Sequence, residues 1–404
     1  MRRVAITGMG VVSSIGANVA EVTRALKEAK SGVAFAPEFA ERGFKCQVYA
    51  KPPVNVEEAL DRRTRRFMGE GAAWNYIAMQ EAINDARLAP DEISHPMTGI
   101  VMGSGGPSTE SIVQAADITR ETKGTKRIGP TVVPKAMSST NSATLAVPFK
   151  ILGLNYSISS ACATSVHCIG AAAEQIMWGK QDVVFAGGGE DVHWTMANLF
   201  DAMGAMATAF NDTPTTASRA YDKNRDGFVI AGGAGVVVLE EMERAKARGA
   251  TIYGEIVGYY ANSDGYDMVQ LSGEGAVRCM REALKTVKQP VDYVNTHGTS
   301  TPVGDSKETA ALREVFADKI PPFSSTKSLT GHSLGAVGAQ ETIYSLIMMR
   351  DKFLCESAHI EEIDPEFADL PIVRERVDNA QIDCFLTNSF GFGGTNGCLV
   401  VSRA

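Results

Sequence analysis

The chain has 404 residues, of which 44% are hydrophobic and 21% are charged, and its formal net charge is −8. This composition is typical of a globular protein large enough for two packed halves, and it argues against a disordered or membrane-embedded chain. The negative charge argues against broad nucleic-acid binding, which requires many Lys and Arg side chains against phosphates, so any basic surface must be local.

The N-terminus, MRRVAITGMGVVSSIG, combines two arginines with an apolar run, as a signal peptide does, but Gly, Ser and Thr interrupt that run. We interpret it as a buried strand and a turn. No stretch approaches the roughly 18 consecutive apolar residues of a membrane-spanning helix. The seven cysteines form neither a CxxC pair nor a zinc-ligand spacing, so we expect a reducing, cytoplasmic location and no bound metal.

Short apolar runs then alternate with longer helical segments along the chain. The runs include RRVAITG, TGIVMGSG, DVVFAGGG, AGVVVLEE and VDYVNTHG, which indicate the buried strands of an α/β protein. Helical periodicity covers residues 74–87, and residues 165–178 predict an almost wholly apolar helix. The strand-like TIYGEIVGYY restarts the pattern at residue 251. We therefore divide the chain into two α/β halves, residues 1–250 and 251–404, which share one core because no flexible linker separates them.

Three motifs resemble ligand sites but lack a residue that those sites require. TGMGVVSSIG places Ser13 where a dinucleotide-binding loop has its third glycine. DKNRDG opens like a calcium-binding loop, but its twelfth position is Gly233 instead of a glutamate. NSFGFGGTN has Asn396 at the last glycine position, and we interpret it as a loop that exposes its backbone. We therefore expect neither a bound nucleotide nor calcium.

The stretch SISSACATSVHCIG surrounds Cys162 with small residues at the expected start of the apolar helix. Free amide groups and the helix dipole at such an end stabilise a thiolate, which makes Cys162 a candidate nucleophile. A packing role is the alternative, because free cysteine is among the residues most often buried. Cys168, six residues later, fits that alternative better.

Two histidines follow strand-like segments in glycine-rich loops: His297 in VNTHGTSTPVGD and His332 in KSLTGHSLGA. One histidine in such a loop is more often structural than catalytic, but two neutral imidazoles can donate N–H groups to a developing oxyanion. Lys327, five residues before His332, could polarise the same site. The glycines of NSFGFGGTN allow its backbone to approach a thioester closely.

Together, SSACATS, THGTSTPVGD, KSLTGHSLGA and NSFGFGGTN resemble, in this order, the β-ketoacyl-acyl-carrier-protein synthases, most closely the bacterial type I enzymes. The similarity extends from MRRVAITGMG to the GFGGTN loop. It implies a thiolase-like fold, in which two similar βαβαβαββ halves form a five-layer αβαβα core, and a homodimer. It also implies that the protein elongates fatty acids by condensing an acyl group with the malonyl group of an acyl-carrier protein, with loss of carbon dioxide and without an organic cofactor.

The resemblance also implies roles for single residues. Cys162 accepts the acyl group, and its N–H forms an oxyanion hole with the N–H of Phe392. His297 and His332 bind the carbonyl oxygen of the malonyl thioester and stabilise the enolate that decarboxylation produces. The enolate carbon then attacks the acyl thioester on Cys162.

The resemblance extends to the surroundings of these residues. Lys327 supports His332, and Glu341 lies just behind the site, where it is either part of the machinery or only a structural ion-pair partner. A monovalent cation near Asn295, Glu341 and Asn388 is implied by the resemblance alone.

Other positions match those that bind substrate. They are Thr299 and Thr301 for the phosphopantetheine arm, Gly106, Met137, Met196, Phe200 and Phe228 for the acyl pocket, and Phe390 with Phe392 at the pocket mouth. Glycine at position 106 lacks the bulky gate residue of the type II enzymes, which favours type I. The preferred acyl length stays open.

A local basic surface is expected to dock the acidic carrier protein. Its candidate residues are Arg62, Arg63, Arg65 and Arg66 in DRRTRRF, with Lys123, Lys126 and Arg127 in KGTKR. The alternative is an exposed, charged helix end without a partner.

Four other functions compete with this hypothesis. A type II synthase and a polyketide ketosynthase are the nearest alternatives, and the compact, single-function length of the chain argues against a modular polyketide enzyme. A thiolase has a second reactive cysteine near its C-terminus, whereas Cys398 lies beyond GFGGTN here. A non-catalytic partner of a synthase typically lacks the nucleophile, which this chain keeps.

Overall fold

The computed structural model describes residues 1–404, and the N-terminal half of the chain supplies five strands to a central sheet. They are β1 (Val4–Val12), β4 (Thr98–Gly103), β5 (Asn155–Tyr156), β6 (Val183–Glu190) and β7 (Gly233–Glu241). Their order in the sheet is β5-β4-β6-β7-β1. Strand β4 pairs in parallel with β5 and β6, whereas β7 is antiparallel to both β6 and β1. The N-terminal apolar run thus forms a buried strand, as expected.

The C-terminal half repeats this arrangement. Its strands are β8 (Gly254–Ser263), β9 (Tyr293–Asn295), β10 (Phe323–Ser324), β13 (Cys384–Gly391) and β14 (Thr395–Ser402), in the order β10-β9-β13-β14-β8. The two pairs made by β9 are parallel, and the two made by β14 are antiparallel. Antiparallel pairing of β1 with β8 joins both halves into one ten-stranded sheet, so the predicted shared core is confirmed.

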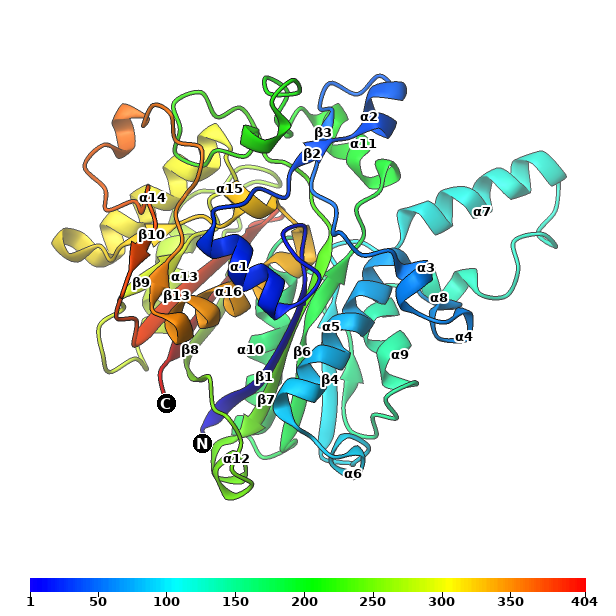
Figure 1. The fold of residues 1–404 in the computed structure, drawn as a ribbon, viewed down its shortest axis with the longest axis horizontal. Coiled ribbons are helices and arrows are strands. Elements are labelled where there is room, and N and C mark those ends of the chain that lie inside the picture. The colour runs from blue at the N-terminus through cyan, green and yellow to red at the C-terminus, as the bar shows by residue number, and fades with distance from the viewer.

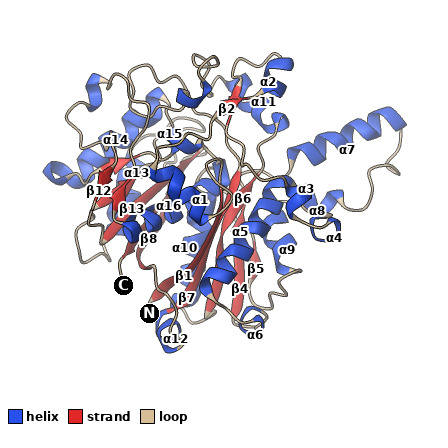
Figure 2. Ribbon diagram, in the orientation of Figure 1, coloured by secondary structure: helices blue, strands red, loops and turns tan.

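Six helices occupy equivalent places in the two halves. Helices α5 (Glu70–Ala86), α9 (Thr140–Ala146) and α10 (Thr164–Met177) follow the first three strands of the N-terminal half; α13 (Glu274–Leu284), α14 (Pro302–Phe316) and α16 (Val337–Asp351) do so in the C-terminal half. Each half is therefore βαβαβαββ, which confirms the predicted α/β repeat (Figures 1 and 2). The division at residue 250 falls between β7 and β8 and stays a prediction.

Helices α10 and α16 lie in the main hydrophobic core, where residues of both halves meet. Ile169 of α10 and Ile343 of α16 are fully buried there. Thirteen of the residues of α16 are buried, because this helix is covered on all sides, and ten of the residues of α10 are buried as well. These two helices position the segments that precede them.

The remaining elements are short or lie at the periphery. They are α1 (Val19–Lys27), β2 (Ala34–Phe35), α2 (Pro37–Glu41), β3 (Val48–Tyr49), α3 (Val56–Ala59), α4 (Arg62–Arg65), α6 (Pro90–Ile93), α7 (Thr109–Thr122), α8 (Val132–Ala136), α11 (Trp194–Met203), α12 (Met242–Ala247), α15 (Lys327–Thr330), β11 (Phe353–Leu354) and β12 (Val377–Asp378), with 3₁₀ turns at Pro214–Thr216, Ala317–Lys319, Leu334–Ala336 and Pro365–Phe367. Helix α7, cyan in Figure 1, projects away from the body. None of the helices has both the length and the apolar character needed to cross a membrane.

Candidate active site

Cys162 lies in a tight turn between β5 and the start of α10. Ala161 just before it adopts a left-handed backbone conformation with φ of +50°, which is strained for a residue with a side chain. Two hydrogen bonds stabilise the turn: the Ser160 N–H donates to Thr164 Oγ1 at 2.8 Å, and that hydroxyl donates to the Ala161 carbonyl at 2.7 Å. The turn holds Cys162 against a cavity of about 410 Å³.

The structure brings the two histidines to this cysteine. One nitrogen of His297, one nitrogen of His332 and Cys162 Sγ all lie within 4.8 Å of one another. His297 follows β9, and His332 follows α15. Their rings are nearly perpendicular, at 89°, with centroids 5.3 Å apart. All three residues line the same cavity, so one bound thioester can reach each of them.

Both histidines are neutral at physiological pH. Burial lowers the pKa of His297 and of His332 well below the usual value, and the positive charge of Lys327 lowers both further. A neutral imidazole carries one N–H donor and one lone pair. The pair can therefore donate to an oxyanion or accept a proton without first losing one.

The electrostatics of Cys162 differ from the expectation. Cys162 is half-buried at the cavity wall, and burial raises the pKa of the thiol to about 12, while the Lys327 charge opposes the rise and Glu190 adds to it. The expectation of a resting thiolate, based on the start of α10 alone, neglected this burial. Cys162 is thus a thiol in the resting site, and its proton must leave during attack, for which a neutral histidine is within reach.

Lys327 and Glu341 form a buried ion pair, with Lys327 Nζ donating to Glu341 Oε1 at 2.5 Å. Burial raises the pKa of Glu341 to about 7, against the opposing effect of Lys327. Glu341 Oε2 has no hydrogen-bond partner. Glu341 is therefore an ion-pair partner whose Lys lies close enough to both histidines to lower their pKa values.

Two buried glutamates that the sequence analysis did not name support the site. Glu308 on α14 accepts hydrogen bonds from the backbone N–H groups of His297 and Gly298, both at 2.8 Å, and so fixes the histidine loop. Glu190 at the end of β6 accepts from the N–H groups of Gly105 and Gly335, at 2.6 and 2.8 Å. Both acids are visible in the sequence, at the ends of HGTSTPVGDSKE and GGGE, but only geometry reveals the amides that they bind.

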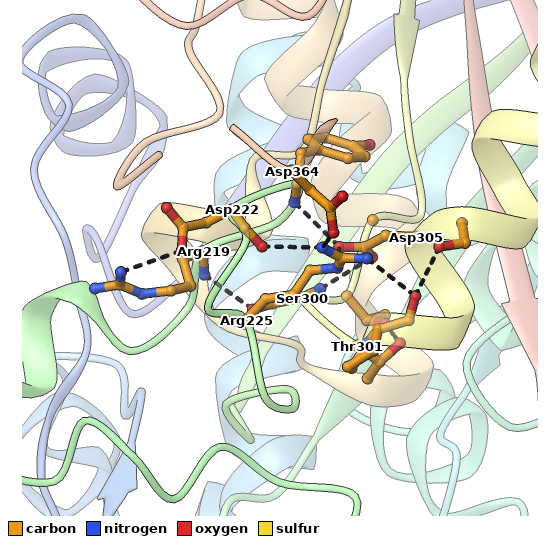
Figure 3. A network of polar contacts seen from close by, with 12 residues as sticks. Arg219, Asp222, Arg225, Ser300, Thr301, Asp305 and Asp364 are labelled. Carbon is orange, nitrogen blue, oxygen red and sulfur yellow. Dashed lines mark hydrogen bonds and ion pairs between the residues drawn. The ribbon is translucent and has the colours of Figure 1, made fainter. Parts of the chain in front are cut away.

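The DKNRDG segment ties neighbouring loops together, as Figure 3 shows. Arg225 Nη1 lies 2.7 Å from Asp364, and its Nε lies 3.4 Å from Asp305. Asp305 also accepts from the N–H of Ser300, which stands in the HGTST loop. Arg225 and Asp222 of this segment are therefore engaged in internal bonds between loops.

The cavity contains most of the predicted substrate-binding residues. Its lining includes Thr299, Thr301, Phe200, Phe228, Phe390 and Phe392. The two threonine hydroxyl oxygens lie 2.9 Å apart on one wall. This combination of a polar wall and aromatic side chains suits a thioester with a polar arm and an apolar acyl chain.

Three predicted acyl-pocket residues lie outside this lining. Gly106 and Met196 are neighbours, because a Cβ added at Gly106 would come 2.5 Å from Met196 Cε. Met137 is half-buried at the end of α8, away from the cavity lining. Their assignment to the acyl pocket stays a prediction.

The GFGGTN loop is the tip of the hairpin formed by β13 and β14. Gly393 and Gly394 have φ of +83° and +71°, so the turn requires glycine there. Gly391 packs directly on the nucleophile turn: a Cβ added to it would lie 3.1 Å from the Cys162 backbone nitrogen and from Ala161 Cβ. The loop that carries Phe392 is thus in contact with Cys162, and a shared oxyanion hole is sterically allowed.

The basic residues divide between two places. Those of DRRTRRF line a polar cleft of about 1100 Å³ next to α4, namely Arg62, Arg63, Arg65 and Arg66. Lys123, Lys126 and Arg127 are exposed in the segment after α7 and do not line that cleft.

Comparison with known proteins gives two family matches. Residues 1–245 match the family model described as "Beta-ketoacyl synthase, N-terminal domain", and residues 253–361 match the model described as "Beta-ketoacyl synthase, C-terminal domain". The 3-oxoacyl-[acyl-carrier-protein] synthase 1 of Haemophilus influenzae is 56% identical over 403 residues, and that of Escherichia coli is 55% identical over 404 residues. Each alignment covers 100% of this chain and 99% of the relative.

A more distant relative is the 3-oxoacyl-[acyl-carrier-protein] synthase 2 of Coxiella burnetii, 38% identical over 100% of this chain and 99% of its own length. Among solved structures, a β-ketoacyl synthase from Burkholderia phymatum matches with a TM-score of 0.94 and 35% identity, covering 100% of both chains. A type II polyketide ketosynthase in complex with its acyl-carrier protein matches with a TM-score of 0.92 and 28% identity, over 100% of this chain and 99% of that one.

Proposed function

This chain belongs to the β-ketoacyl synthase family, and we propose that it elongates fatty acids as a type I enzyme through the three residues Cys162, His297 and His332. The chain is 55–56% identical to two 3-oxoacyl-[acyl-carrier-protein] synthase 1 proteins and 38% identical to a 3-oxoacyl-[acyl-carrier-protein] synthase 2. This difference supports type I over type II. The fold is thiolase-like, as its β-ketoacyl synthase neighbours show. The observation that carries the residue assignment is the 4.8 Å cluster of one sulfur and two imidazole nitrogens in the cavity.

In the first half-reaction, Cys162 accepts an acyl group from a carrier thioester. The thiol proton moves to a neutral imidazole while the sulfur attacks the carbonyl carbon, and the carrier leaves as a free thiol after taking up that proton. The tetrahedral intermediate carries negative charge on oxygen. Backbone N–H groups of Cys162 and Phe392 stabilise it, since the loop of Phe392 packs against the nucleophile turn.

In the second half-reaction, a malonyl thioester loses carbon dioxide. The bond electrons become an enolate, whose oxygen accepts hydrogen bonds from His297 and His332. The enolate carbon attacks the acyl-Cys162 carbonyl and the C–S bond breaks, which gives a β-ketoacyl-carrier two carbons longer. The released Cys162 thiolate takes up one proton from solvent, so Cys162 returns to its resting thiol.

The buried Lys327 acts on this step through the histidines. Burial is the main reason that both imidazoles are neutral, the Lys327 charge lowers their pKa values further, and Glu341 compensates that charge. A resident monovalent cation near Glu341 is a further part of the proposal. Glu341 Oε2 and Asn295 Oδ1 are buried oxygens without hydrogen-bond partners, and such oxygens suit a hard cation. The cation would offset the negative charge of the Glu341 carboxylate. Asn388 fits less well, since its oxygen already accepts from the Cys398 thiol at 3.2 Å. A higher Tm in potassium than in tetramethylammonium salt would support the cation, and equal Tm values would remove it.

The partner is an acyl-carrier protein, as in the complex of the related polyketide ketosynthase. We assign its docking to the basic residues of DRRTRRF and KGTKR, which are exposed or line an open cleft.

A homodimer and a cytoplasmic location are also proposed. The projecting helix α7 supports the homodimer, because Ile112 is 47% exposed on it and Val133 beyond it is 73% exposed. Sedimentation at the mass of one chain would exclude the dimer.

The function is tested with purified protein, an acyl-carrier thioester and malonyl-carrier protein. We expect one carbon dioxide for each β-ketoacyl product, with a product mass two carbons longer than the acyl donor. Condensation of acyl-coenzyme A with acetyl-coenzyme A without carbon dioxide release would instead identify a thiolase.

A further inference from the structure

His167 is a buried histidine that the proposed mechanism does not use. It lies near the start of α10, five residues after Cys162, and is 9% exposed. Its Nδ1 lies 2.7 Å from Ser160 Oγ, and its Nε2 lies 3.1 Å from the backbone oxygen of Asn396. The ring therefore bonds to Ser160 and to Asn396, which are 236 residues apart in the sequence.

The two bonds fix the state of the ring. A carbonyl oxygen can only accept, so His167 Nε2 must carry a hydrogen and donate it to Asn396. Burial lowers the pKa of His167, although the bond to Asn396 opposes this, and the ring is neutral. Nδ1 is then a lone pair, and the Ser160 hydroxyl donates to it. Each bond thus has one defined donor and one defined acceptor.

On one side, the bond holds the nucleophile turn. Ser160 stands two residues before Cys162 and forms an isolated bridge with it. Its N–H is bound to Thr164, so the hydroxyl bond to His167 restrains the same residue a second time. The strained Ala161 lies between these two points, and the direction of the Cys162 N–H follows from how Ser160 is held.

On the other side, the bond holds the hairpin of β13 and β14. Asn396 pairs with Phe390 at the end of the hairpin, and the tip beyond them carries Phe392. A Cβ at Gly397 would come 3.0 Å from Nε2 and Cδ2 of His167, so glycine at this position lets the ring approach the strand. His167 therefore contacts the base of the tip, while Gly391 of the same hairpin contacts Cys162.

We propose that His167 is a positioning residue for the oxyanion hole: by bonding to Ser160 and to Asn396, it sets the separation of the Cys162 and Phe392 amide groups. The inference rests on the proposed function, because it assumes that these two amides stabilise a thioester intermediate. It assigns to His167 no contact with substrate. Acyl transfer needs the aligned amides, whereas alkylation of the sulfur does not.

The test compares two reactions of Cys162 at one pH. They are acylation by an acyl-carrier thioester and alkylation by iodoacetamide, both followed by intact-protein mass. His167→Phe removes both bonds, and we expect acylation to fall at least about tenfold, since a misplaced oxyanion donor costs this much or more. Alkylation should change by less than about threefold, because it develops no oxyanion.

Two conservative variants distinguish the bond to Ser160 from the bond to Asn396. They also distinguish a positioning effect from a folding defect. His167→Asn places a polar atom near Nδ1 and keeps a partner for Ser160, and His167→Gln places a donor near Nε2 and keeps one for Asn396. Each should lose less acylation than His167→Phe. Cys168→Ala, buried on the same helix, is the control and should leave the ratio of the two rates unchanged.

Normal acylation in all three His167 variants, or an equal loss of acylation and alkylation, would overturn the proposal. If the protein without any substitution is not acylated at all, this result would contradict the proposed function, and the inference with it. The two failures are therefore distinguishable.

Discussion

At the scale of single residues, the reactivity of Cys162 depends on two opposing effects. The start of α10 favours the thiolate, and burial disfavours it. Because burial raises the thiol pKa to about 12, the thiolate fraction should rise about tenfold with each pH unit from 7 to 10. We predict that the alkylation rate of Cys162 by iodoacetamide follows this slope without a plateau.

The matched control is Cys162→Ala, which should remove the reaction because the other six cysteines are buried. A plateau below about pH 8 would contradict the account and show that the helix start outweighs burial, since such a plateau marks a depressed thiol pKa.

The Lys327–Glu341 pair gives a stability prediction. Lys327→Met leaves Glu341 buried without its partner, and we expect a loss of about 3 kcal/mol in the free energy of unfolding. A buried carboxyl with a raised pKa destabilises the fold as pH rises above its unfolded value, so the loss should be larger at pH 9 than at pH 6. Urea unfolding of Lys327→Met, and of the double variant Lys327→Met with Glu341→Gln, at pH 6 and pH 9 measures the loss of unfolding free energy and its pH dependence. A double variant no more stable than the single one would be the contrary result.

Gly106 provides a prediction about chain length. An isoleucine there would push on Met196, whose side chain is flexible, and both residues are predicted to border the acyl pocket. We expect Gly106→Ile to elongate long acyl chains at least about tenfold more slowly while short chains are barely affected, as a filled pocket excludes only the longer ligand. Product mass profiles across donor lengths test this. Faster elongation of very long chains than by the parent would contradict the pocket assignment.

At the scale of elements, the nucleophile turn and the β13–β14 hairpin are in direct contact at the site. Gly391→Ala would put a Cβ 2.9 Å from Thr395 Cγ2 and 3.1 Å from the Cys162 nitrogen, so the hairpin or the turn must shift slightly. We predict a fall in kcat of about 10 to 100-fold, because small displacements of catalytic groups are costly. Gly124→Ala, in open space after α7, is the control. Equal activity of the two variants would show that the contact is unimportant.

Much of this element structure could be predicted from the sequence. Short apolar runs predicted β1, β4, β6 and β7, and a mainly apolar segment predicted α10. Strands of two residues, such as β5 and β10, have too short a pattern to be seen. Helix α5 begins at Glu70, four residues before the predicted start, because Gly71 to Ala73 pack into the core as small residues.

The site was predictable in part. Motifs pointed to Cys162, His297 and His332, and the structure brings these three residues together at one cavity. Glu190 and Glu308 were missed because they act by accepting backbone N–H groups, and any acidic residue has that capacity. The resting thiol of Cys162 was missed because burial of the sulfur arises from segments distant in the sequence.

At the scale of the whole molecule, the two halves supply different parts of one site. Cys162 comes from the N-terminal half, and both histidines come from the C-terminal half. Pairing of β1 with β8 and the shared core around α10 and α16 hold these parts in register. A swinging motion of the halves would separate the sulfur from the imidazoles, so a continuous sheet is required by the chemistry.

Local basic charge on an acidic protein gives a prediction about docking. Arg62→Glu with Lys126→Glu should raise KM for the carrier-bound substrate about tenfold or more at low salt, because complementary charge speeds association. Acylation by a small thioester should not change. Lys319→Glu, exposed elsewhere, is the control. An unchanged KM in the double variant would remove the docking surface.

The most direct test of the central claim separates the two half-reactions in His297→Ala with His332→Ala. After incubation with acyl-carrier and malonyl-carrier protein, peptide mass would locate the acyl group while released carbon dioxide is measured. We predict that acyl-Cys162 accumulates without carbon dioxide above background, since the imidazoles are needed for decarboxylation. Release at the parental rate, or an acyl group on a residue other than Cys162, would contradict the account.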